Sequence, residues 1–146
     1  MGGSTLKVRD MEHIVDEVIL RFKSGKVGDR DYVTFDLFAD DQGVTKAGFI
    51  IDGITIMGRA GLEGLAGVTF EMDAESEDEL NDLTGCTIYE PGRPLQLAQL
   101  KIVFGSLQGD SMDIRLEASC FGPNFQTATL EQDISVVGHL AAKIES

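Results

Sequence analysis

The densest group of side chains that could do chemistry is acidic. It holds seven carboxylates within twelve residues: Glu71, Asp73, Glu75, Glu77, Asp78, Glu79 and Asp82. Oxygen-rich clusters of this kind bind calcium, but the Asp-x-Asp-x-Asp-Gly spacing of a calcium loop is absent. Ser76 and Glu79 have the spacing of a capping box, so we expect a short acidic helix near residues 75–83. Its carboxylates would form a solvated face able to bind a basic partner protein.

A second unusual stretch has a glycine at every third position: Gly58, Gly61, Gly64 and Gly67. A phosphate-binding loop would need the Gly-x-Gly-x-x-Gly spacing, or a lysine after the last glycine, and this stretch has neither. We therefore expect a turn or a closely packed helix, with a mobile ligand-gating loop as the alternative.

The remaining candidates are metal ligands and nucleophiles. Four residues have side chains of the types that bind zinc: His13, His139, Cys86 and Cys120. They are scattered along the chain, without the paired spacing of a zinc site. Gly109-Asp110-Ser111 is similar, over three residues only, to the nucleophile block of GDSL-type esterases. Met112 replaces the usual leucine, however, and the Asp-x-x-His partner is missing. We expect a turn there, two buried free thiols, and no catalytic residue, metal or cofactor.

Charge is distributed unevenly along the 146 residues, whose formal net charge is −13. Residues 1–30 hold six Lys or Arg against five Asp or Glu, whereas residues 31–146 hold six against twenty. Such a field repels phosphate groups, so we expect neither a nucleic-acid nor a membrane partner. Residues 1–5 lack the features of a secretory signal, and we expect them to form a disordered tail on a cytoplasmic protein.

The clearest structural signal is the segment Ser111–Cys120, which has an apolar residue at every even position. This alternation predicts a half-buried strand, joined in a hairpin to the apolar run before it. Further strands are predicted near residues 32–38, 48–57 and 68–72. Residues 128–144 fit both a strand and a helix, and we favour the strand.

Near the N-terminus the apolar residues have helical spacing: Met11, Ile14, Val15, Val18, Ile19 and Phe22. This pattern predicts an amphipathic helix over residues 11–23, with a strand from Val18 to Phe22 as the alternative because four of the six are β-branched. The whole chain is thus predicted to be one α+β domain. Its main sheet would be antiparallel, arranged as a sandwich or a partly open barrel.

The expected function is that of a non-catalytic interaction module whose acidic face masks a basic surface on another protein. The alternative is a small-molecule carrier with an apolar interior built from Phe35, Leu37, Ile54, Ile56, Phe70, Ile102, Phe104, Ile114 and Leu116. A hydrolase with paired carboxylates is the third possibility. Self-association through an exposed strand edge, such as Ser111–Cys120 or the C-terminal segment, is also open.

Overall fold

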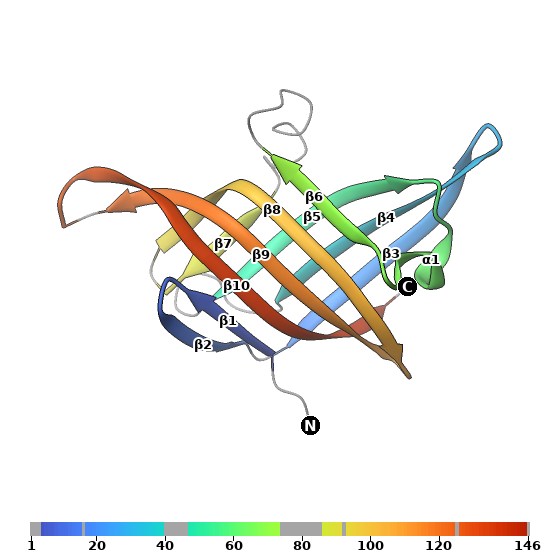
Figure 1. Ribbon diagram of the computed structural model, residues 1–146, viewed down its shortest axis with the longest axis horizontal. Helices are drawn as coiled ribbons and strands as arrows, with labels where there is room; N and C mark the ends of the chain where they lie inside the picture. The colour runs from blue at the N-terminus through green and yellow to red at the C-terminus, as the bar shows by residue number, and fades with distance from the viewer. Residues whose placement is uncertain are drawn as a thin grey trace.

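The computed structural model describes residues 4–15, 17–39, 47–73, 86–91, 93–124 and 126–145. These residues form ten strands and one short helix (Figure 1). The elements are β1 (Ser4–Val8), β2 (Met11–Val15), β3 (Val18–Val27), β4 (Arg30–Ala39), β5 (Gly48–Met57), α1 (Gly61–Leu65), β6 (Thr69–Asp73), β7 (Thr87–Glu90), β8 (Arg93–Gln108), β9 (Ser111–Asn124) and β10 (Thr129–Glu145).

Seven strands close the sheet on itself in the order β3, β4, β5, β7, β8, β9, β10 and back to β3. All neighbours in this ring are antiparallel except β10 and β3, which run parallel over residues 143–145 and 19–21. In Figure 1, β8, β9 and β10 cross in front of β3, β4 and β5. The predicted antiparallel sheet is therefore confirmed, and it closes rather than remaining open.

The long strands β8 and β10 each carry two partners along one side. On β8, residues 93–96 pair with β7 and residues 99–103 pair with β6. On β10, residues 136–139 pair with β1 before residues 143–145 reach β3. The β1–β2 hairpin and β6 thus extend the sheet beyond the ring, with β2 and β6 as its two ends.

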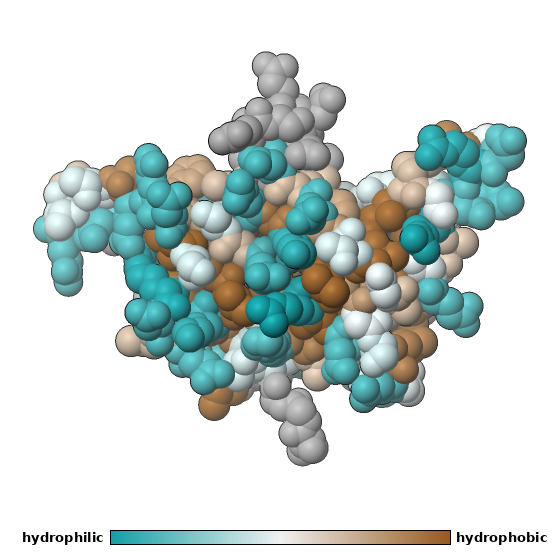
Figure 2. Space-filling view, viewed as in Figure 1, coloured by the Kyte–Doolittle hydropathy of each residue, from teal (hydrophilic) through white to brown (hydrophobic). Residues whose placement is uncertain are grey.

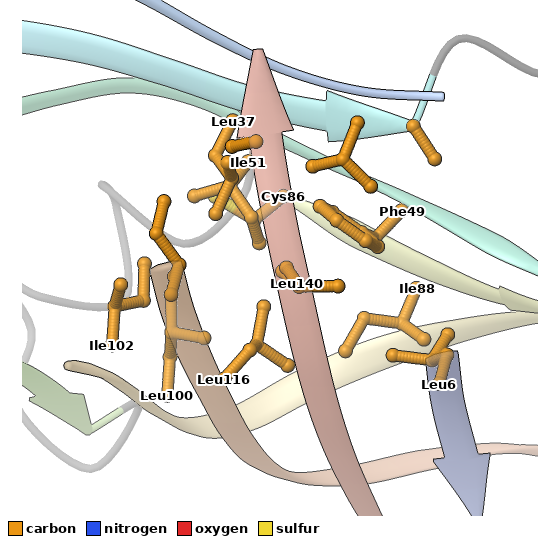
Figure 3. Packing of buried hydrophobic residues seen from close by; sticks show 14 of the residues in the cluster. Leu6, Leu37, Phe49, Ile51, Cys86, Ile88, Leu100, Ile102, Leu116 and Leu140 are labelled. Atoms are coloured by element: carbon orange, nitrogen blue, oxygen red, sulfur yellow. The ribbon is translucent and has the colours of Figure 1, made fainter. Parts of the chain in front are cut away.

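The interior of the ring is the hydrophobic core (Figure 3). Along β9, Met112, Ile114, Leu116 and Cys120 are buried, which confirms the predicted alternation. Of the nine side chains proposed to line an apolar interior, seven are buried and two, Ile56 and Phe70, are partly buried against the core. The hairpin between β8 and β9 turns at Gly109 and Asp110, and Ser111 begins β9, so the turn predicted for the esterase-like tripeptide is confirmed at its first two residues.

The α+β prediction is wrong, because the segment predicted as an N-terminal amphipathic helix forms strands. Met11–Val15 is β2, paired with β1, and Val18 begins β3, paired along its length with β4. The β-branched residues of the apolar stripe suit a pleated sheet, and pairing with neighbours from elsewhere in the chain outweighs their helical spacing. Gly25 lies in β3, where an added Cβ would collide with the Tyr32 ring.

Other N-terminal and acidic predictions have mixed outcomes. Ser4 and Thr5, expected in a disordered tail, lie in β1. The predicted acidic helix near residues 75–83 lies outside the described residues. The C-terminal strand is confirmed as β10. Within the described ranges, no helix is long and apolar enough to cross a membrane.

Candidate acidic groove

A groove of about 580 Å³ lies on the outer face of the sheet where β6, β8, β9 and β10 run side by side. We call it the acidic groove. Its lining residues are Glu71, Met72, Asp73, Gln99, Leu100, Lys101, Glu117, Ala118, Ser119, Ser135, Val136 and Val137. In Figure 2, hydrophilic residues gather across the middle of this face, with hydrophobic ones between them.

The strand register determines which polar side chains meet in the acidic groove. One row of cross-strand partners runs through Glu71, Lys101, Glu117 and Val137, from β6 to β10. The next row runs through Asp73, Gln99, Ser119 and Ser135. Directly opposed residues have Cβ atoms about 5 Å apart, so each row is a continuous line of neighbouring side chains.

The acidic groove is negative overall because three carboxylates face a single lysine. Lys101 lies between Glu71 and Glu117 in the register of the first row. In the second row, the Gln99 amide donates a hydrogen bond to the Asp73 carboxylate at 3.1 Å. Glu117 also receives the Arg115 guanidinium at 3.5 Å. Both Glu117 and Lys101 are half-buried, which strengthens their electrostatic interactions relative to fully exposed groups.

A second hollow of about 330 Å³ continues along the same strands. Its polar residues include Asp113, Arg115 and His139, and the last two are cross-strand partners. Because Arg115 pairs with Glu117, the two hollows together hold four carboxylates against Lys101 and Arg115, and this face is negative overall.

The structure places two of the seven predicted acidic residues in the acidic groove. Glu71 and Asp73 lie on β6 at its border. The other five, Glu75, Glu77, Asp78, Glu79 and Asp82, lie outside the described residues. Sequence reasoning missed Glu117, Gln99 and Lys101. The alternation in β9 placed Glu117 on a solvent face, but pairing partners on other strands cannot be seen in one strand's pattern.

The glycine-rich stretch forms a turn and a short helix at the end of the closed sheet. Gly58, Gly61 and Gly67 have positive φ angles of 83°, 68° and 81°, which glycine adopts without strain. The Gly61 amide donates to the Ser24 hydroxyl at 2.8 Å, and the Gly67 amide donates to the Phe104 carbonyl at 2.8 Å. Gly64 lies within α1, where Leu65 enters the core. A ligand-gating role for this stretch stays a prediction.

The other candidate residues are dispersed. Cys86 and Cys120 are both buried, and burial raises the pKa of Cys120 to about 12. Ser111 donates its hydroxyl hydrogen to the Gln108 carbonyl within the β8–β9 turn. In the described part of the chain, no three His, Cys, Asp or Glu side chains come together as a metal site.

A group of four charged side chains joins several strand ends away from the acidic groove. Arg9 in the β1–β2 turn donates to Glu131 and, at 2.7 Å, to Glu90. Arg93 contacts Glu90 at 2.6 Å and Glu131 at 3.2 Å, and it also donates to the Pro123 carbonyl. Hydrogen bonding to Arg9 lowers the pKa of Glu131. Each carboxylate binds both guanidinium groups, so this group of four charges is neutral. It links the ends of the strands that carry it, and we call it the ion-pair cluster.

Comparisons of the chain with protein-family models, with curated proteins and with solved structures find no match.

Proposed function

We propose that this protein is a non-catalytic interaction module that binds a basic segment of a partner protein in the acidic groove. The observation that carries the proposal is the row of Glu71, Lys101 and Glu117 beside Asp73, which sets three carboxylates against one lysine. Asp73, Lys101 and Glu117 are half-buried, and Glu71 is exposed. A Lys- or Arg-rich segment offers the complementary charge, and charge complementarity guides both encounter and register.

The size of the acidic groove supports an extended segment as its ligand. Four adjacent strands span about 15 Å, a distance that about five extended residues cover. Lys101 would repel a basic residue placed directly over it, whereas Glu71 and Glu117 on either side would attract one. The proposed ligand therefore has basic residues spaced to straddle Lys101, with a neutral residue between them.

The packed core supports a surface site over an interior one. Phe35 contacts both Phe70 and Phe104 edge to face inside the sheet, where the alternative carrier function would require a ligand. Cys120 is a buried free thiol, which fits a reducing compartment, so we propose a cytoplasmic location.

Backbone amide NMR during titration with a Lys-x-Lys hexapeptide tests the site. We expect the largest shifts at Glu71, Lys101, Glu117 and their strand neighbours, and we expect added salt to reduce them. Shifts confined to other surfaces, or no shifts at low salt, would contradict the proposal.

A further inference from the structure

The strand β2 is an edge of the sheet that exposes large hydrophobic side chains. Among the described residues it pairs only with β1, so its other side has no strand partner. Protein edges are usually protected by charge, proline or a covering segment, because a free edge pairs readily with another strand. β2 instead carries the two most exposed large hydrophobic residues of the described chain, Met11 at 66% and Ile14 at 77%.

Both faces of β2 carry apolar or polar side-chain groups that lack a neighbour. Met11 and Ile14 point to opposite faces, since alternate residues of a strand do so. His13 shares a face with Met11, and its buried Nε2 atom has no hydrogen-bond partner in the described structure. One additional strand beside β2 would cover apolar surface on both faces at once.

The edges suggested from sequence are not available. Ser111–Cys120 lies in β9, which is paired on both sides by β8 and β10. The C-terminal strand β10 has β9 on one side and β1 and β3 on the other. Of the described ends of the sheet, β2 therefore combines a free side with exposed apolar residues.

Charge favours a second copy of the same chain at this edge. The chain as a whole is strongly acidic, and most of its surfaces would repel a copy of themselves. The β1–β2 hairpin is less acidic, because Lys7 partly offsets Asp10 and Glu12, while Arg9 is neutralised by Glu90 and Glu131. Two copies can approach through this hairpin against only a small like charge.

We propose that the protein forms a dimer in which β2 pairs antiparallel with β2 of the partner subunit, about a two-fold axis at His13. This register pairs all five residues of β2, with Met11 opposite Val15 of the partner subunit and Glu12 opposite Ile14 of the partner subunit. An axis at Glu12 would oppose two like charges, which is destabilising. An axis at Ile14 would place Met11 beyond the paired segment.

Sedimentation measured from about 1 µM to about 1 mM tests the dimer. The wild type is expected to shift from the 15.8 kDa monomer to twice that mass with rising concentration. Ile14→Lys, which adds an edge charge, is expected to stay monomeric. Leu130→Lys, the matched change at a residue 57% exposed on β10, is expected to dimerise like the wild type. A monomeric wild type throughout, or dimerisation of Ile14→Lys at wild-type strength, would overturn the proposal.

Cross-linking tests the register. In the proposed dimer His13 faces His13 of the partner subunit with Cβ atoms about 5 Å apart, within reach of a disulfide after small adjustment. His13→Cys is expected to form a covalent dimer under mild oxidation, whereas Lys7→Cys on β1 is not. Cys86 and Cys120 are buried and do not compete. Equal cross-linking of both variants, or none in His13→Cys, would overturn this register.

Discussion

The rings of Phe35 on β4 and Phe104 on β8 meet edge to face inside the closed sheet, with centroids 5.1 Å apart and planes at 87°. These two strands are not neighbours in the sheet, so the contact crosses its interior. Phe70 on β6 adds a third ring, 6.1 Å from Phe35. The protein's own side chains therefore fill the space where a carrier would hold its ligand, which supports the proposal of a site on the outer face.

The first prediction concerns this contact. Phe104→Ala removes a fully buried ring and leaves a cavity, so we expect the free energy of unfolding to fall by about 3–5 kcal/mol. Urea denaturation followed by circular dichroism measures the loss. Leu130→Ala, at a largely exposed residue, is the control and should change stability by less than about 0.5 kcal/mol. A similar small effect for both variants would show that the interior is not packed as described.

A second prediction concerns Glu131 and pH. Hydrogen bonding to Arg9, followed by that to Arg93, lowers the pKa of Glu131 below its ordinary value of 4.5. A carboxyl with a depressed folded pKa stabilises the fold above its unfolded pKa and loses that effect as pH falls through the folded value. Glu131→Gln should therefore lower Tm at pH 7, with the difference from wild type shrinking below pH 4.5. Scanning calorimetry at several pH values, with exposed Glu12→Gln as control, measures it. A Tm difference between the variant and the wild type that stays constant down to pH 2 would contradict a stabilising role for the ion-pair cluster.

A third prediction concerns Asp52, whose removal should raise stability at neutral pH rather than lower it. Asp52 lies beside Asp36, and the hydrogen bond and charge of Asp36 raise the pKa of Asp52 above its ordinary value of 3.8. A raised folded pKa means that the charged carboxylate destabilises the fold at neutral pH and that protonation relieves it. Asp52→Asn should raise Tm slightly at pH 7. We expect the gain in the free energy of unfolding to stay below about 1 kcal/mol, because the site is exposed. The gain should disappear as pH falls toward 3.8 and below. A lower Tm at neutral pH would be inconsistent with repulsion between these carboxylates.

A fourth prediction concerns the thiols. Burial raises the pKa of Cys120 to about 12, and both Cys86 and Cys120 are shielded from solvent. At pH 8 a disulfide reagent should therefore label neither thiol in the native protein and both after unfolding. Ser119→Cys, one position before Cys120 and half-exposed in the acidic groove, provides the matched control and should be labelled within the native state. Rapid labelling of the native wild type would place at least one thiol at the surface.

The sequence specified strands well where one face is buried and the other is wet. The alternation from Ser111 to Cys120 predicted β9 because the pleat repeats every two residues. At the N-terminus the apolar residues from Met11 to Phe22 fitted both a strand and a helix. The break between β2 and β3 after Val15 gives their apolar positions the spacing of one helical face. Pairing with β1 and β4 decides between them, and that information is not local.

The candidate site was predictable only in part for a similar reason. Density of carboxylates identified Glu71 and Asp73 along the chain, and both border the acidic groove. Glu117 lies more than forty residues away in sequence, and it meets Lys101 and Glu71 only through the registers of β9 with β8 and of β8 with β6. Register depends on turns and on bulges, such as the shift between Leu97 and Gln99 in β8. A single sequence does not reveal these.

The most direct test of the account is the affinity of a fluorescent Lys-x-Lys hexapeptide for three forms of the protein, measured by anisotropy at low and high salt. The double variant Glu71→Lys with Glu117→Lys reverses the charge of the acidic groove, whereas the control pair Asp29→Lys with Asp110→Lys makes the same charge change at exposed turns elsewhere. We predict binding at least about tenfold weaker for the double variant, with a flatter salt dependence, and near wild-type binding for the control. Equal weakening by both pairs would show that only net charge matters and would contradict binding in the acidic groove.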